Sequence, residues 1–254
     1  MKIPGLILVA SILAGCASSG GGSDGTPQMD STRAQAIARI HTELAASYYE
    51  RTQYSIALQE VGVALQADGN FAPAYAMRAL VRMQLREDEQ ADADFLHSLD
   101  LDSSSSETHN NYGWFMCQRG RAKESIAQFR EALKNPLYTT PETAYVNLAL
   151  CSKKAGVLKD VENNLQRALI MRPEMPDALY GLAEWYFDKG DYAGAKSYFL
   201  RFSQGVPELN AEQLWLAVRI ERKMRDRNSE ASYSLQLRKR FPTARETQLL
   251  MQGR

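Results

Sequence analysis

The stretch His109-Asn110-Asn111-Tyr112-Gly113-Trp114-Phe115-Met116-Cys117-Gln118-Arg119-Gly120 lies near the middle of the 254-residue chain. It places a large aromatic residue beside the smallest residue at Tyr112-Gly113, and it closes on Gly120, a residue typical of helix ends. A second amphipathic run follows over residues 124–133. Together these features predict one helix–turn–helix unit.

The same unit recurs along the chain. Small residues return at Ala45, Ala79, Gly113, Ala149, Ala183 and Ala217, so that successive positions differ by 34, 34, 36, 34 and 34. Twelve residues after each of the first five comes Ala57, Ala91, Ser125, Val161 and Ala195, and a bulky residue stands four further on at Val61, Phe95, Phe129, Leu165 and Phe199. Three residues beyond these lie Ala64, Ser98, Ala132, Ala168 and the larger Phe202. Small residues let two antiparallel helices approach, and bulky residues fill the neighbouring grooves.

This period resembles the tetratricopeptide repeat, a helix pair of about 34 residues. The resemblance implies an all-α fold, a right-handed α-solenoid of about six tetratricopeptide repeats over residues 36–245. We place the repeats at about 38–71, 72–105, 106–139, 142–175, 176–209 and 210–245. The alternative is an irregular helical bundle whose periodicity is accidental.

The sixth repeat departs from the pattern. After Ala217 its second helix is best matched through Ala231 and Leu235, two residues late. We expect its charged outer face to meet water, as the terminal repeat of a solenoid must. Residues 246–254 are expected to extend this repeat or to fray as a C-terminal tail.

The N-terminus predicts export. A short positive end precedes an apolar run over residues 3–13, which is too short for a membrane-spanning helix and typical of a signal peptide. The run closes on Leu13-Ala14-Gly15-Cys16, which resembles a bacterial lipobox, so we expect a signal peptide over residues 1–15 and lipidation of Cys16. The alternative is an ordinary signal peptide with a cysteine near its cleavage site. Residues 16–35 are predicted to form a Ser/Gly-rich tether. By resemblance to the sorting of proteobacterial lipoproteins, Ala17 after the cysteine favours the outer membrane.

The charge balance gives no global electrostatic target. Thirty basic residues match thirty acidic ones, so no nucleic-acid partner is expected. Charge is nevertheless segregated: repeat two is acidic through Glu87, Asp88, Glu89, Asp92, Asp94, Asp100 and Asp102. Repeat six is basic through Arg219, Arg222, Lys223, Arg225, Arg227, Arg238, Lys239, Arg240 and Arg245. Each run is interpreted as a solvated helix face, or, for the basic end, as a docking site for an acidic partner or lipid headgroups.

The inner wall of such a solenoid is formed by the first helix of each repeat. An apolar and aromatic wall suits a helix or an extended segment of a partner protein. The predicted groove residues are Tyr49, Leu80, Met83, Asn110, Trp114, Leu150, Tyr180 and Phe187. The alternative for each of them is a place in the core between repeats.

Cys117 and Cys151 stand one repeat length apart on the first helices of repeats three and four. Neighbouring first helices can bring two Cα atoms within the roughly 4.4–6.8 Å that a disulfide requires, and an exported protein meets an oxidising compartment. The two-residue insertion at 139–141 shifts their relative positions. We therefore predict a disulfide between Cys117 and Cys151, with two separate buried thiols as the alternative.

No catalytic pattern emerges. The three histidines fall on different repeats, and neither HExxH nor CxxC occurs. We expect no enzyme activity, no metal site and no cofactor other than the covalent lipid on Cys16.

Residues 110–117, Asn-Asn-Tyr-Gly-Trp-Phe-Met-Cys, resemble the Asn-Asn-Tyr-Gly-x-Phe-Leu-Cys signature of the type IV pilus biogenesis lipoproteins of the PilF/PilW family, with Met116 in place of Leu. The resemblance implies a lipid-anchored pilotin on the periplasmic face of the outer membrane of a Gram-negative bacterium. Such a protein assists localisation and multimerisation of the secretin, the pilus pore, and its chemically different ends favour a monomer. Two other lipoprotein scaffolds remain open: a general outer-membrane protein assembly factor and an activator of periplasmic peptidoglycan enzymes.

Overall fold

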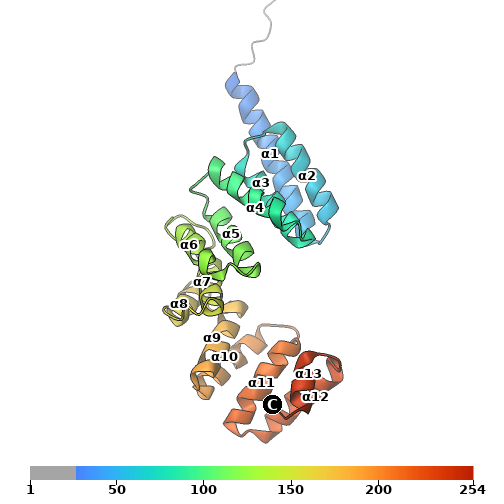
Figure 1. Cartoon of the computed structure of the whole chain (residues 1–254), viewed down its shortest axis with the longest axis vertical. Coiled ribbons are helices and arrows are strands. Elements are labelled where there is room, and N and C mark those ends of the chain that lie inside the picture. The colour runs from blue at the N-terminus through green and yellow to red at the C-terminus, as the bar shows by residue number, and fades with distance from the viewer. Residues whose placement is uncertain (1–26, 254) are drawn as a thin grey trace, which may run out of the picture.

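The computed structural model describes residues 27–253, and over this range the chain is entirely helical (Figure 1). The predicted signal peptide and Cys16 lie outside the described residues. The helices are α1 (Pro27–Glu50), α2 (Tyr54–Ala67), α3 (Ala72–Leu85), α4 (Asp88–Leu101), α5 (Ser106–Gln118), α6 (Ala122–Ala132), α7 (Pro141–Lys154), α8 (Val161–Met171), α9 (Pro176–Lys189), α10 (Tyr192–Gln204), α11 (Ala211–Met224), α12 (Arg227–Arg240) and α13 (Arg245–Met251).

Consecutive helices pack in pairs, and the pairs stack one upon the next along an elongated, curved molecule (Figure 1). Each pair falls in one predicted repeat, from α1 and α2 in the first to α11 and α12 in the sixth. The predicted all-α solenoid of tetratricopeptide repeats is confirmed.

Local sequence explains where these helices begin and end. Pro141 and Pro176 occupy the first turns of α7 and α9, where a missing N–H costs nothing. Gly190 ends α9 with a φ of 82°, a backbone conformation that glycine adopts without a Cβ clash. The short breaks that result bring the two helices of a repeat back against each other.

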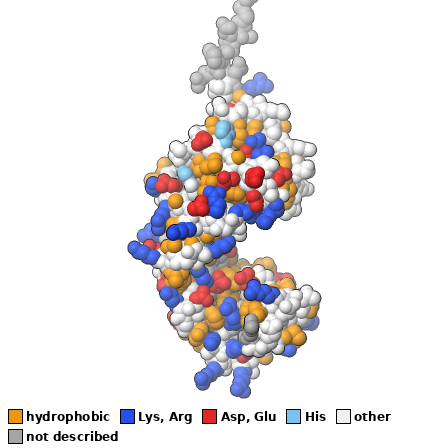
Figure 2. Space-filling model, viewed as in Figure 1, with side chains coloured by type: hydrophobic (Ala, Val, Ile, Leu, Met, Phe, Trp, Pro, Cys, Tyr) orange, Lys and Arg blue, Asp and Glu red, His pale blue; other side chains and the backbone are white. Residues whose placement is uncertain are grey.

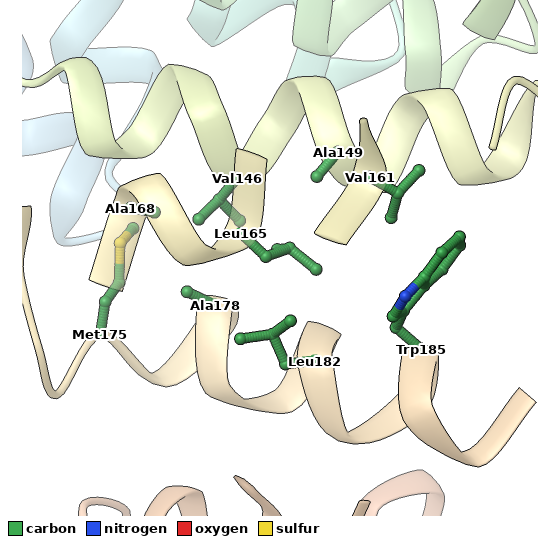
Figure 3. Packing of buried hydrophobic residues seen from close by; sticks show 9 residues of the cluster. All are labelled: Val146, Ala149, Val161, Leu165, Ala168, Met175, Ala178, Leu182 and Trp185. Carbon is green, nitrogen blue, oxygen red and sulfur yellow. The ribbon is translucent and has the colours of Figure 1, made fainter. Parts of the chain in front are cut away.

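The repeating positions form the core. Every described frame residue is buried, from Ala45 and Val61 in repeat one to Phe199 and Phe202 in repeat five. Figure 3 shows the principle in repeats four and five, where side chains of α7, α8 and α9 converge around Leu165 and Leu182. The second helix of one repeat thus lies between two first helices, and the core is continuous from repeat to repeat.

The helical domain begins earlier than the sequence predicted. We expected a tether over residues 16–35, but α1 already begins at Pro27. The glycine-rich composition ends at Gly25, and no glycine recurs before Gly62, so the helix can extend back to a proline suited to a first turn. The tether prediction is therefore wrong for residues 27–35.

The second helix of the sixth repeat is shifted by one residue, not by two. Ala231 and Leu235 are exposed, whereas Ser234 and Leu237 are buried, so the expected two-residue shift is wrong. Ser234 and Leu237 stand one residue later after Ala217 than the buried residues of the other repeats, because α12 begins one residue late. Tyr233 beside them packs edge-on against Phe199, with ring centroids 6.1 Å apart.

Residues 245–251 form a helix that covers the last repeat. The α13 helix packs against α11 and α12, where Leu249 and Leu250 contact the cluster around the fully buried Leu237. Thr247 is also buried, and its hydroxyl donates to the carbonyl of Phe241 over 2.6 Å. Of the two expectations for this segment, extension of the repeat is confirmed and fraying is wrong over residues 245–251, because Leu249 and Leu250 cover apolar residues of α11 and α12.

Candidate functional site

A pocket opens on the inner wall of the first three repeats, between α1, α3 and α5. Its volume is about 240 Å³. Its lining residues recur at the three- and four-residue spacing of one helix face: Thr42, Glu43, Ala46, Pro73, Ala76, Met77, Leu80, Ser105, Glu107, Thr108 and Asn111. The inner wall is therefore hollowed where the predicted groove begins.

The pocket has an apolar floor and an acidic rim. Ala76 and Met77 are buried in α3, and Leu80 beside them is partly exposed. Glu43 and Glu107 are exposed, and neither makes an ion pair with any other described residue. An apolar side chain that enters this pocket would therefore lie between two unpaired carboxylates.

Leu80 is the predicted groove residue that lines this pocket. Tyr49 lies one turn beyond Ala46 on α1 and is partly exposed. Its hydroxyl accepts a hydrogen bond from Gln84 Nε2 over 2.8 Å, and burial raises its pKa. Tyr49 therefore extends the inner wall beyond the pocket, and its hydroxyl is held by Gln84 of α3.

Met83 and Asn110 belong to the interior. Met83 packs with Phe95 and Tyr112 in the core between α3, α4 and α5. Asn110 is buried, and its Oδ1 accepts from Asn147 Nδ2 over 3.0 Å, which ties α5 to α7. Their prediction as exposed groove residues is wrong, because the next repeat covers this side of each helix.

Trp114 and Leu150 are partly buried packing residues. Trp114 contacts the core of repeats two and three and also the core around Cys117. Leu150 packs against the cluster of repeats four and five that Figure 3 shows. Both side chains lie at junctions between repeats, so they support the inner wall as well as bordering it.

The second half of the inner wall is aromatic and charged. Tyr180 and Phe187 pack on the core of repeats five and six, and the Arg219 guanidinium lies 4.6 Å above the Phe187 ring. The Tyr180 hydroxyl is buried without a hydrogen-bond partner, and this burial raises its pKa. Burial likewise raises the pKa of Glu184, although Lys153 lies 3.7 Å from its carboxylate.

Cys117 of α5 and Cys151 of α7 form a disulfide with their Cα atoms 5.9 Å apart. Both residues are buried. The predicted disulfide is therefore confirmed, and two separate thiols are excluded. It joins repeats three and four across the proline-containing loop before α7, where the step between successive repeats is longest.

Several carboxylates in the acidic run of repeat two form ion pairs. Asp94 is 4% exposed and accepts hydrogen bonds from both Arg78 and Arg82. Two further carboxylates of α4 reach the following repeat, in the pairs Asp88–Arg119 and Asp92–Arg121, at 2.6 and 2.8 Å. The expectation of a solvated acidic face is wrong for these residues, because Asp94 joins the two helices of repeat two and the other two carboxylates join repeat two to repeat three.

Charges of the basic sixth repeat are also partly neutralised. Arg222 pairs with Glu230 at 2.8 Å, and Arg240 pairs with Glu208 at the same distance. Figure 2 shows acidic and basic side chains interspersed over the visible face. The exposed basic residues that make no ion pair with another described residue are Lys223, Arg225, Arg227, Arg238, Lys239 and Arg245.

Within the range that the structure describes, no three histidine, cysteine, aspartate or glutamate side chains gather as metal ligands. None of the helices in residues 27–253 combines the length and the apolar character needed to cross a bilayer. The pocket between α1, α3 and α5 and the inner wall around it form a surface on which another protein can bind.

A crystal structure of PilW, described as a widely conserved type IV pilus biogenesis factor, is 32% identical to this chain. The match covers 85% of this chain and 98% of PilW, with a TM-score of 0.77. The chain belongs to the PilF/PilW family. No protein-family model matches the sequence.

Two comparisons with PilF of Pseudomonas aeruginosa agree. Its sequence, named type IV pilus assembly protein, is 28% identical over 243 residues, which cover 96% of this chain and 95% of PilF. A solved structure of Pseudomonas aeruginosa PilF has a TM-score of 0.80 and 26% identity over 87% of this chain and all of that one. The resemblance thus spans the whole solenoid of this PilF/PilW family member.

The pocket residues that the sequence analysis did not name lie on the same helices as those it named. On α1, steps of three and seven residues back from the predicted Tyr49 reach Ala46 and Thr42, so helical spacing was the available signal there. On α5, the pocket residue Asn111 follows the predicted Asn110 by one residue. The rotation of α5 that exposes Asn111 instead of Asn110 left no such signal.

Proposed function

We propose that this protein acts in type IV pilus biogenesis as a lipid-anchored scaffold of the outer membrane. Its pocket between α1, α3 and α5 binds a secretin subunit, and the bound subunit is carried to the membrane or stabilised while it multimerises. Membership of the PilF/PilW family supports a role in type IV pilus biogenesis. The apolar pocket on the inner wall is the observation that carries the mechanism.

The pocket suits an amphipathic partner segment. Its floor of Ala46, Ala76 and Leu80 accepts an apolar side chain, and about 240 Å³ is large enough for one such anchor. The unpaired carboxylates of Glu43 and Glu107 favour a basic residue next to that anchor. The segment recognised is therefore an apolar residue flanked by lysine or arginine.

The anchor is proposed at Cys16. Acyl chains on this residue hold a protein on a membrane at roughly 0.8 kcal/mol for each buried methylene. Ten residues separate Cys16 from the first residue of α1, and α1 forms one end of the stack (Figure 1). An anchored Cys16 would thus present the N-terminal repeats, and with them the pocket, closest to the membrane.

The scaffold acts as a monomer and without catalysis under this proposal. The two ends of the stack are built from different residues, the first repeat at one end and α13 on the last repeat at the other, and this difference disfavours head-to-tail assembly. A solenoid with an apolar inner pocket is suited to bind a partner protein, and this proposal assigns it no catalytic step.

The pocket is tested by Ala46→Glu. Ala46 is partly exposed on α1, so a glutamate adds bulk and charge to the pocket without emptying the core. We expect loss of secretin binding in a pull-down and loss of secretin multimers from outer-membrane fractions. The matched control is Ser47→Glu, one residue along the same helix on an exposed position outside the pocket.

If Ala46→Glu, folded as judged by circular dichroism, bound the secretin as well as Ser47→Glu does, the pocket would not be its binding site. Porin levels measured in the same membranes separate a secretin-specific scaffold from a general outer-membrane assembly factor. Unchanged piliation together with altered cell-wall synthesis in a deletion strain would instead favour an activator of peptidoglycan enzymes.

The anchor is tested by Cys16→Ala in the full chain. We expect the protein to leave the outer-membrane fraction and secretin multimers to decrease there. Multimers at the normal level in the outer membrane would show that lipidation of Cys16 is not required.

A further inference from the structure

A second pocket opens where α6 and α8 meet α7. Its volume is about 350 Å³, within the range of small-molecule sites. The lining residues are Arg130, Leu148, Ser152, Val157, Lys159, Asp160, Asn163, Asn164 and Arg167. It shares none of them with the pocket between α1, α3 and α5.

Positive charge surrounds this pocket. Arg130, Lys159 and Arg167 supply three cations, against the single carboxylate of Asp160. None of the three cations makes an ion pair with a described residue, and the Arg167 guanidinium donates to the Tyr145 hydroxyl and lies over its ring. Figure 2 shows basic side chains gathered along the left edge of the molecule, at the level of α5 to α8 in Figure 1.

Two buried polar side chains face the pocket without partners. Ser152 is 3% exposed and Asn164 is 9% exposed, yet neither side chain makes a hydrogen bond with another described residue. The polar groups of both side chains therefore remain open to the pocket, where a ligand can reach them. The serine hydroxyl and the asparagine amide can both donate to oxygen atoms of a ligand.

The start of α8 adds a third favourable element. Asp160 precedes the helix in a left-handed conformation, and its side chain does not cap the first turn. The first N–H groups of the helix consequently lack a side-chain acceptor. Helix N-termini favour anions through these N–H groups and through the helix dipole.

We propose that this pocket binds a phosphate group. The cations of Arg130, Lys159 and Arg167 neutralise its charge, and Ser152, Asn164 and the N-terminus of α8 donate hydrogen bonds to its oxygens. The volume exceeds what one phosphate needs, so the phosphate carries a small polar substituent. Two sources share this chemistry: the headgroup of an anionic phospholipid and a free phosphoryl compound.

The proposal is tested on the full chain held in nanodiscs of phosphatidylcholine, whose headgroup carries no net charge. Inorganic phosphate is titrated while the amide resonances of Asn163 and Asn164 are followed by nuclear magnetic resonance, with acetate as a comparison anion. We expect saturable shifts of these two resonances with phosphate and about tenfold weaker binding of acetate, since a phosphate accepts more charged hydrogen bonds.

Two variants remove the recognition in different ways. Arg130→Glu with Lys159→Glu reverses the charge of two exposed side chains, and Ser152→Ala removes a donor while keeping a small buried residue. We expect the double variant to weaken phosphate binding by at least about tenfold and Ser152→Ala by a smaller factor. Lys123→Glu is the matched control, because Lys123 is exposed on α6 outside the pocket.

Nanodiscs with equal parts of phosphatidylglycerol and phosphatidylcholine separate the two sources. A lipid headgroup in the pocket would shift the same resonances before phosphate is added and weaken the apparent phosphate affinity. If the natural ligand is instead a free phosphoryl compound, the phosphate titration should be the same in nanodiscs with and without phosphatidylglycerol. The proposal is overturned if phosphate gives no saturable shift at residues 163 and 164, if acetate binds as tightly, or if the double variant binds like Lys123→Glu.

Discussion

Phe129 of α6 packs against Gly113 of α5 so closely that a Cβ on residue 113 would lie 2.8 Å from Phe129 Cε1. Phe129 is fully buried, so its ring can move away only if the core around it repacks. We therefore expect Gly113→Ala to lower the free energy of unfolding by about 1–3 kcal/mol, as overpacking does. Urea denaturation followed by circular dichroism measures the change.

A second helical glycine provides the control. Gly62 lies in α2, and a Cβ there would meet no atom within 4 Å. Alanine at this position should stabilise the helix by about 0.5–1 kcal/mol, because it removes the backbone freedom of glycine in the unfolded chain. Equal stabilisation by both substitutions would contradict the close packing at Gly113.

The disulfide between Cys117 and Cys151 should contribute much of the stability of the central repeats. Closing a loop between two residues with a sequence separation of 34 restricts the unfolded chain, and bonds of this kind typically contribute about 2–4 kcal/mol. We expect Cys117→Ser with Cys151→Ser to lower the free energy of unfolding by this amount. Urea denaturation without reductant measures it.

Reductant supplies the control for this prediction. The wild-type protein should lose the same stability when dithiothreitol is present, whereas the double serine variant should not respond. A wild-type unfolding curve that is indifferent to reductant under conditions where both thiols are free would refute the contribution of the bond.

The repeat could be predicted because it depends on side-chain volume at fixed spacing. Wherever two helices cross, one position must be small and another must fill the gap, as Gly113 and Phe129 do. This requirement returns in the chain once per repeat, with a single longer step between Gly113 and Ala149. The fold, the core and the helix pairs follow from it.

The binding surface could be predicted only in part, because it depends on how each helix is rotated against the next repeat. One residue along a helix turns the side chain by about 100°. Asn110 therefore faces α7 and pairs with Asn147, while Asn111 lines the pocket. The pocket between α6 and α8 needs an uncapped helix start at Asp160, and an aspartate before a helix normally predicts a cap instead.

Asp94 anchors two arginines of α3 to α4. Its carboxylate oxygens accept from Arg78 Nη2 over 2.6 Å and from Arg82 Nη1 over 2.7 Å, and its side chain is 6% exposed. Because removing one partner leaves the other charges without compensation, we expect Asp94→Asn to cost about 2–4 kcal/mol, less than a fully buried pair since both arginines reach solvent.

Thermal and urea unfolding measure this cost against Asp100→Asn as the control. Asp100 lies on the same helix, is exposed and makes no ion pair with a described residue. Its substitution should leave the unfolding midpoint within error of the wild type. A similarly small effect at Asp94 would mean that the two arginines are satisfied by solvent.

Glu184 should make stability depend on pH in an unusual direction. Burial raises its pKa above the ordinary value of 4.5, and the nearby carboxylates of Glu212 and Asp188 act in the same sense, against Lys153 and Arg219. The folded state thus holds this proton more tightly than the unfolded state. The penalty of ionising Glu184 is absent below pH 4.5, develops as the pH rises through its folded pKa, and is complete above it.

Glu184→Gln keeps the shape of the side chain and removes this penalty. We expect the variant to melt at a higher temperature than the wild type at pH 7 and at the same temperature at pH 4. Lys153 keeps an ion pair in the variant, because Asp188 lies 2.7 Å from its Nζ. Asp177→Asn is the control: Asp177 is exposed on the same helix, makes no ion pair with a described residue and does not act on Glu184, so its removal should not stabilise the protein at pH 7. A Glu184→Gln variant that is less stable than the wild type at neutral pH would show that attraction to Lys153 outweighs burial.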